Sequence, residues 1–249
     1  MNLNKFSHRL RSVRVDEWSV WRDARWLVQR VCTDLPAGSL AVVIGRNGSG
    51  KSTFLRSLAG LLLVQDGWQF SGTCQFQMED VVSRADDRRL CVSYLGQTMF
   101  ASEELTVDGF LSLTPTDSAQ LAKLKELFEL GRFGHMRLSQ LSGGQWQRVR
   151  LVQSLAKDLP IVLLDEPDAR LDGYWRGILW EQLVERRAAG HVVLVVTHRP
   201  HDLSALATHW LGFEDGGLMF CESHPAVFPR TLVDRLFLGK TLDSSEGVD

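Results

Sequence analysis

The sequence contains no long hydrophobic run and no strong excess of charge. Its apolar segments fall far short of the about 20 residues that a membrane-spanning helix needs, and no secretory h-region starts the chain. The 28 Lys and Arg residues nearly balance 30 Asp and Glu, so charge gives no reason to expect nucleic-acid binding. We therefore expect a cytoplasmic protein that acts on a membrane only through a partner.

Cysteine is scarce, and no internal repeat is visible. The four cysteines fall at no metal-ligand spacing, and three lie in apolar, strand-like surroundings: they are Cys32, Cys74, Cys91 and Cys221. We expect reduced thiols in the core of a cytoplasmic protein. The 249 residues are enough for one large α/β domain, residues 1–249, with a sizeable core.

The sequence does contain a Gly-rich loop between a strand and a helix. The almost wholly apolar run 39–44 is typical of a strand that is buried on both faces of a parallel sheet. Lys51 would bring positive charge to the β- and γ-phosphates, and the Ser52 hydroxyl is placed to bind Mg²⁺. The loop fits the phosphate-loop pattern G-x-x-x-x-G-K-[ST], and we expect it to bind a nucleoside triphosphate through Gly45, Arg46, Asn47, Gly48, Ser49, Gly50, Lys51, Ser52 and the following Thr53.

Two further apolar runs end in polar residues that complete this chemistry. The run 161–164 ends in Asp165 and Glu166, and the run 192–196 leads to His198. Because parallel strands end at one edge of a sheet, we expect these side chains near the phosphate loop. We interpret Asp165 as a ligand of Mg²⁺ and Glu166 as the general base for a water lined up on the γ-phosphate. His198 would sense the γ-phosphate and orient Glu166.

A second Gly-rich turn opens a helix far downstream of the phosphate loop. One nucleotide does not need two phosphate-binding turns from the same chain, but two copies of the chain do if each closes the other's site. The N–H groups at the helix start and the Ser142 hydroxyl can cap a γ-phosphate from the opposite chain. The residues of this turn are Leu141, Ser142, Gly143, Gly144 and Gln145.

Together these residues resemble the ATP-binding cassette (ABC) ATPases. The resemblance implies a P-loop NTPase (RecA-like) α/β core with a mostly parallel sheet, an antiparallel β subdomain and an inserted helical subdomain. It also implies ATP and Mg²⁺ as cofactors and a head-to-tail dimer, with Gln97 as a catalytic residue and Mg²⁺ ligand. The motifs occur in family order: Walker A at 45–53, the Q-loop at Gln97, the signature at 141–145, Walker B at 161–166, the D-loop at 169–172 with Asp172, and the H-loop at His198.

The resemblance also predicts how the chain is organised. We expect the nucleotide-binding α/β core at 1–96 and 158–241 and the helical signature subdomain at 97–157. In the helical part, Asp117 is placed to cap a helix with a buried leucine face. The small, polar and acidic segment 242–249 is expected to be disordered.

Family members stack adenine on an aromatic residue upstream of Walker A. Trp21 is the best match here, in place of the usual tyrosine, and Trp18 and Trp26 are the alternatives. Stacking of an aromatic ring on a purine contributes a few kcal/mol at most. A tryptophan in an early strand is equally compatible with a place in the core.

Family members also drive a membrane permease. Phe100, Leu105, Val107 and Phe110 follow the Q-loop, where the permease docks, although they can equally form the core of the helical subdomain. The short runs at 105–107 and 141–151 are similar to ATP subunits of metal-chelate and vitamin B12 importers. The resemblance thus implies an importer subunit on the cytoplasmic face of the cell membrane. Its expected partners are a second copy or a homologous cassette, permease subunits and a substrate-binding protein; the cargo stays open.

Two other classes of function remain as alternatives. Soluble ABC ATPases that act on nucleic acid, ribosomes or iron–sulfur assembly usually show two cassettes, a coiled-coil insertion or a divergent signature, and none is visible here. A regulatory module that holds ATP without turnover is disfavoured by Glu166 and His198. The chain departs from the family pattern at Ser39, Asp168 and Arg170, none of which belongs to the expected hydrolytic groups.

Overall fold

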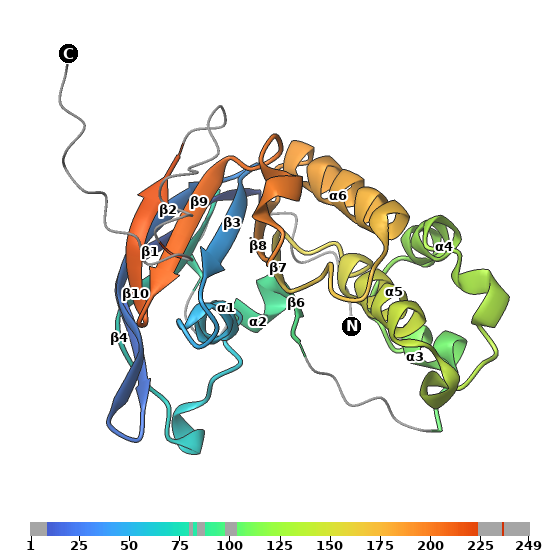
Figure 1. Ribbon diagram of the computed structural model, residues 1–249, viewed down its shortest axis with the longest axis horizontal. Coiled ribbons are helices and arrows are strands. Elements are labelled where there is room, and N and C mark those ends of the chain that lie inside the picture. Colours follow the sequence, from blue (N-terminus) through green and yellow to red (C-terminus); the bar gives the residue numbers. More distant parts are fainter. Residues whose placement is uncertain (1–8, 80–81, 84–87, 98–103, 224–235, 237–249) are drawn as a thin grey trace, which may run out of the picture.

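The computed structural model describes residues 9–79, 82–83, 88–97, 104–223 and 236. In this part of the chain, a ten-stranded sheet has the order β5-β4-β1-β2-β10-β9-β3-β8-β7-β6 (Figure 1). Its strands are β1 Leu10–Arg22, β2 Arg25–Pro36, β3 Leu40–Gly45, β4 Gln69–Met78, β5 Val82–Ser83, β6 Val92–Leu95, β7 Ile161–Asp165, β8 Val192–Val196, β9 His209–Glu214 and β10 Gly217–Glu222. The α-helices are α1 Lys51–Leu58, α2 Arg88–Cys91, α3 Val107–Ser112, α4 Ser118–Leu127, α5 Gly143–Leu155 and α6 Gly173–Ala188. This architecture confirms the expected α/β class.

The N-terminal strands form the antiparallel part of the sheet. β1 pairs antiparallel with both β2 and β4, and β5 pairs with β4. Asp23 and Ala24 have positive φ angles of 51° and 60°, the geometry of a two-residue hairpin turn between β1 and β2. The hairpin sets Trp21 directly opposite Trp26.

The other half of the sheet is mostly parallel. β6, β7, β8 and β3 are parallel neighbours, and β9 lies parallel on the other side of β3. Leu40, Val42 and Ile44 of β3 face the core that contains residues of α5 and α6, whereas Ala41 and Val43 face the core that contains α1. Burial on both faces explains why this strand is apolar throughout. The parallel direction brings the carboxyl ends of β3, β7 and β8 to one edge of the sheet.

The helices α3, α4 and α5 lie together with α6, away from the antiparallel strands (Figure 1). Asp117 caps α4 by accepting a hydrogen bond from the Ala119 N–H, which confirms the helix expected there. Leu124 and Phe128 are fully buried in the core that contains α5. The division into a core at 1–96 and 158–241 and a helical subdomain at 97–157 stays a prediction.

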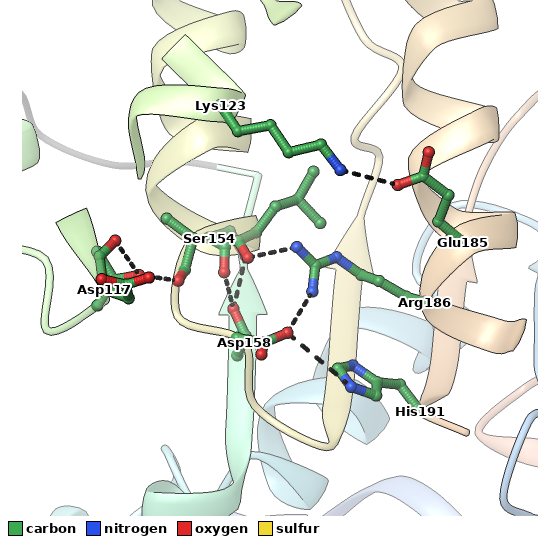
Figure 2. A network of polar contacts seen from close by, with 11 residues as sticks. Asp117, Lys123, Ser154, Asp158, Glu185, Arg186 and His191 are labelled. Atoms are coloured by element: carbon green, nitrogen blue, oxygen red, sulfur yellow. Dashed lines mark hydrogen bonds and ion pairs between the residues drawn. The ribbon is translucent and has the colours of Figure 1, made fainter. Parts of the chain in front are cut away.

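A buried arginine ties the end of α5 to α6 (Figure 2). Arg186 Nη2 donates to the Leu155 carbonyl oxygen at 2.5 Å, and Nη1 lies 3.3 Å from Asp158 Oδ1. The Arg186 side chain is 6% exposed, and this burial lowers its pKa. His191 Nε2 lies 4.0 Å from the same Asp158 oxygen. The contacts join the C-terminal end of α5 to α6 and to His191, the residue that precedes β8.

Replacing Arg186 with methionine is expected to lower the free energy of unfolding by about 2–4 kcal/mol. Methionine keeps an unbranched apolar stem but leaves the Leu155 carbonyl and Asp158 without their cation. Chemical denaturation measures the loss. Lys123→Met is the control, because it removes the exposed ion pair between Lys123 and Glu185, whose charged atoms are 3.7 Å apart. This pair is also drawn in Figure 2, and its loss should cost less than about 1 kcal/mol. Equal losses in both variants would contradict this role of Arg186.

The prediction of core cysteines was wrong for two of the four. Cys74 and Cys91 are buried, but Cys32 and Cys221 are exposed. The exposed pair lies on β2 and β10, where alternate side chains point away from the core. An apolar neighbourhood in the sequence therefore does not identify the buried face of such a strand.

The residues predicted to receive a permease are mostly part of the interior. Val107 and Phe110 are buried in the core that contains α5, and Leu105 is partly buried against it, so the alternative interpretation holds for the first two. Phe100 lies outside the described residues, as does the predicted tail 242–249. None of the described helices has the length and apolarity that crossing a membrane requires.

Candidate functional site

The phosphate loop leaves β3 and enters α1, as predicted. Gly45, Gly48 and Gly50 have positive φ angles of 150°, 80° and 98°. A Cβ would lie 2.2 Å from the Phe213 carbonyl oxygen at Gly45 and 2.3 Å from the Leu27 carbonyl oxygen at Gly50. Only glycine fits at these two positions, because β9 and β2 press on the loop from outside.

The Lys51 side chain folds back onto the loop. Its Nζ donates to the carbonyl oxygens of Gly45, at 2.8 Å, and Arg46, at 2.7 Å. Burial lowers the pKa of Lys51, and the carboxylates of Asp165 and Glu166 oppose this shift. The ammonium group is thus held inside the loop, where a phosphate group could take the place of the carbonyl oxygens.

Asp165 ends β7 beside Ser52. It is only 2% exposed, and its Oδ1 atom is buried without a hydrogen-bond partner among the described residues. Burial is the main cause that raises the pKa of Asp165, and the neighbouring Ser52 side chain lowers it. A carboxylate oxygen without a partner, next to a hydroxyl group, fits the oxygen ligands that Mg²⁺ prefers.

Glu166, Gln97 and His198 meet at one carboxylate oxygen. Gln97 Nε2 donates to Glu166 Oε1 at 2.7 Å, and His198 Nε2 lies 3.0 Å from the same atom. Glu166 adopts a left-handed φ of 53°, and its backbone N–H donates to the Val196 carbonyl at the end of β8. The ends of β6, β7 and β8 therefore bring together the three side chains that the sequence singled out.

These residues share a cavity of about 490 Å³ with the phosphate loop. It is lined by the loop from Asn47 to Thr53, by Gln97, Glu166 and His198, and by Arg25 and Leu27. Arg25 and Leu27 belong to no motif, and the sequence did not predict them as site residues. Arg25 and Leu27 reach the cavity because the β1–β2 hairpin places β2 against the loop. In the sequence, the turn after Trp21 is the feature that indicates this hairpin.

The signature turn begins α5 but does not line this cavity. The Ser142 hydroxyl accepts from the Gln145 N–H at 3.3 Å, and Gln145 Oε1 accepts from the Ser142 N–H at 2.8 Å. This reciprocal cap still leaves the hydroxyl hydrogen of Ser142 able to donate. Gly143 lines a separate cavity of about 290 Å³ with Gln97 and Glu166. The structure thus keeps the signature apart from the phosphate loop of its own chain, and its contact with a partner's ATP stays a prediction.

A buried polar chain that the sequence did not reveal links α5 to the Q-loop. Arg150 donates to the carbonyl oxygens of Gly96 and Gln97 and to Gln147 Oε1, and Gln147 Nε2 donates to the Pro167 carbonyl at 2.7 Å. Both Arg150 and Gln147 are 5% exposed. These side chains fix the backbone on either side of the Gln97–Glu166 contact.

Asp172, the predicted D-loop aspartate, begins α6. Its Oδ1 accepts from the Trp175 N–H at 3.1 Å, so it serves as the N-cap of the helix. Asp172 is exposed and does not line the cavity of the phosphate loop. A role across a dimer interface stays a prediction.

The three candidate tryptophans have different surroundings. Trp18 is 5% exposed and its N–H donates to the Ser57 hydroxyl, so it is a core residue and no longer an alternative for adenine. Trp21 is partly exposed, and its ring packs against Trp26 with centroids 4.5 Å apart. Trp21 is not among the residues that line the cavity of the phosphate loop. Its stacking on adenine stays a prediction.

Known proteins share this set of motifs and this fold. A family model described as ABC transporter matches residues 28–169. The chain is 32% identical over 225 residues to ABC transporter I family member 1 of Arabidopsis thaliana, covering 88% of this chain and 90% of that protein. Over 193 residues it is 30% identical to the thiamine import ATP-binding protein ThiQ of Rhizobium meliloti, covering 74% and 79%.

A further relative and a solved structure agree. The zinc import ATP-binding protein ZnuC of Ruegeria pomeroyi is 32% identical over 214 residues, covering 84% of this chain and 77% of that protein. A structure described as the ATP binding subunit of an ABC transporter superposes with a TM-score of 0.77 at 22% identity, covering 92% of this chain and 98% of the other. This chain therefore belongs to the ABC transporter family, as one of its ATP-binding cassettes.

Proposed function

We propose that this chain is the ATP-hydrolysing subunit of an ABC importer and that it works as a head-to-tail pair with a second copy or a homologous cassette. The observation that carries the proposal is the contact of Glu166 with Gln97 and His198 beside the phosphate loop, while the signature lies outside that cavity. Import is supported by two relatives, which are a thiamine import and a zinc import ATP-binding protein. The cargo of this chain is not specified by these names.

Hydrolysis follows from the arrangement around Glu166. The Glu166 carboxylate takes the proton of a water that attacks the γ-phosphorus in line, and the bond from the γ-phosphorus to the ADP oxygen breaks. Hydrogen bonds from Gln97 and His198 hold the carboxylate in one orientation. Lys51 exchanges the loop carbonyls for phosphate oxygens and stabilises the negative charge on them.

Three residues would hold a magnesium ion in this site. Ser52 and Gln97 both line the cavity of the phosphate loop, and Asp165 lies beside Ser52. When bound, Mg²⁺ would neutralise negative charge on the β- and γ-phosphates. The unpartnered Oδ1 of Asp165 supports this assignment.

The pair of cassettes would be controlled by the nucleotide. ATP bound to the phosphate loop of one chain is capped by Ser142 and the helix start of the other, so ATP closes the dimer and hydrolysis opens it. On the cytoplasmic face of the membrane, this cycle would drive permease subunits, with a substrate-binding protein delivering the cargo. Co-purification with a permease tests the second part of this proposal, and purification of an active cassette that associates with no permease contradicts it.

Turnover at different protein concentrations tests the composite site. If each site needs both chains, ATPase activity per chain should rise steeply with protein concentration and level off once the pair is saturated. Constant activity per chain down to concentrations at which sedimentation shows only monomers would contradict the head-to-tail assignment.

Magnesium removal gives a separate prediction. Chelation by EDTA should abolish turnover, and Asp165→Asn should raise the Mg²⁺ concentration for half-maximal turnover by about 10- to 100-fold. Asp66→Asn, at an exposed position away from the cavity, is the matched control and should leave that concentration unchanged. Turnover that persists in EDTA would rule out the metal role.

Trp21→Ala should weaken ATP binding without changing the chemical step. Loss of one base–aromatic stack costs about 1–3 kcal/mol, so the Kd for ATP should rise about 5- to 100-fold while kcat stays the same. Equilibrium binding of a fluorescent ATP analogue measures this. Trp26→Ala is the comparison, because its ring packs on Trp21; an effect in Trp26→Ala with none in Trp21→Ala would transfer the role to Trp26.

A further inference from the structure

Asp168 is a buried carboxylate that the hydrolytic scheme does not use. It follows Pro167 directly in the sequence, and it is only 7% exposed. Burial is the main cause that raises its pKa, and the Thr197 hydrogen bond lowers it. Burying a carboxylate costs desolvation free energy, so a buried carboxylate is expected to make a polar contact that an apolar residue could not make.

That contact is with the residue before His198. The Thr197 hydroxyl donates to Asp168 Oδ2 at 2.9 Å and accepts from the Arg199 N–H at 2.9 Å. Thr197 is 2% exposed, so its hydrogen bond to Asp168 is buried, and its bond from the Arg199 N–H is partly buried. These hydrogen bonds therefore hold the residues immediately before and after His198.

The His198 side chain has few polar contacts with the residues that the structure describes. Its side chain is 47% exposed, and the contact that the structure gives it is the 3.0 Å approach of Nε2 to Glu166 Oε1. A half-exposed side chain keeps one orientation only if the backbone beneath it is fixed. The Asp168–Thr197–Arg199 bonds fix that backbone and tie the turn after β8, which carries His198, to the turn after β7, which carries Glu166.

We propose that Asp168 is a positioning residue for ATP hydrolysis, which acts through Thr197 to hold His198 against Glu166. The inference rests on the proposed ATPase function and adds to it a residue that belongs to none of the motifs. It requires an acceptor at Asp168 and a hydroxyl at 197. It does not require a negative charge.

Four substitutions separate these requirements. Asp168→Ala and Thr197→Val remove one partner each and should lower kcat about tenfold or more, with the KM for ATP within about twofold of the unsubstituted chain. Asp168→Asn and Thr197→Ser keep the acceptor and the hydroxyl and should retain kcat within about threefold. In a His198→Ala background, Asp168→Ala should lower kcat no further, because its effect passes through the imidazole.

Each other outcome overturns the proposal. An unchanged kcat in Asp168→Ala and Thr197→Val, a rise in KM alone, or an equal further loss in the His198→Ala background would each show that Asp168 does not act through His198. If Asp168→Ala loses thermal stability, Asp168→Asn serves as the control for folding, because it keeps the hydrogen bond. A tenfold loss of kcat in well-folded Asp168→Asn would also contradict the proposal.

A measurement without nucleotide keeps this inference separate from the proposed function. The imidazole ¹⁵N resonances of His198 and the exchange rate of the Arg199 amide should change in Asp168→Ala and Thr197→Val but not in Asp168→Asn. If the unsubstituted chain shows no ATP turnover, the proposed function fails while these signals still decide whether Asp168 orders the His198 backbone. Unchanged signals in Asp168→Ala would overturn the inference whatever the turnover.

Discussion

Replacing Glu166 with glutamine should lower ATP turnover by about 10²- to 10⁴-fold and leave a stable ATP-bound dimer. The amide cannot take a proton from the attacking water. Its Oε1 can still accept the hydrogen bonds that Gln97 and His198 now make to Glu166 at 2.7 Å and 3.0 Å. The groups that bind ATP therefore stay in place while the base is lost, and ATP accumulates between the two chains.

Two measurements check this result. Single-turnover kinetics give the rate, and size-exclusion chromatography with and without ATP gives the oligomeric state. Glu181→Gln makes the same chemical change at an exposed position of α6 and should behave as the unsubstituted chain. Turnover at the normal rate in Glu166→Gln would remove Glu166 from the role of base.

Replacing Lys51 with alanine should weaken ATP binding on the order of 10²-fold or more. The Lys51 ammonium is held at the loop by two carbonyl oxygens, at 2.8 Å and 2.7 Å, and is poised to exchange them for phosphate oxygens. Charge-assisted hydrogen bonds contribute about 1.5–3 kcal/mol each, and two of them account for a loss of this size. No other lysine lines the cavity among the described residues.

Isothermal titration with ATP measures the affinity, and thermal denaturation checks that the loop variant is folded. Lys123→Ala is the matched control, because its exposed ion pair with Glu185 joins α4 to α6 and neither residue lines the cavity. Labelled ATP that binds Lys51→Ala as tightly as the unsubstituted chain would contradict the assignment of the phosphate loop.

The chemistry at the strand ends could be predicted from the sequence because it depends on local order. A buried strand followed by a Gly-rich loop and a helix fixes where Lys51 lies, and parallel strands that end in Asp165 and His198 meet at one edge whatever the rest of the chain does. Each of these positions can be predicted from the residues of one strand or helix and from the direction of the neighbouring strands.

The parts that could not be predicted depend on contacts across the fold. Arg25 and Leu27 line the cavity because a hairpin sets β2 against the loop, and nothing in their own residue types shows this. Arg150 reaches carbonyl groups far away in the sequence, and the exposure of Cys32 depends on which face of β2 looks outward. Such features follow from the pairing of strands and the packing of helices, which depend on many residues throughout the chain and cannot be read from one local pattern.

The tight fit of the loop glycines has a consequence for affinity. The carbonyl groups of Phe213 and Leu27 leave no room for a side chain at Gly45 and Gly50, so neighbouring strands fix the shape of the loop before nucleotide binds. A preorganised loop loses little conformational entropy when it binds the triphosphate. Affinity should then respond strongly to ionic strength and only weakly to changes that stiffen the surrounding chain.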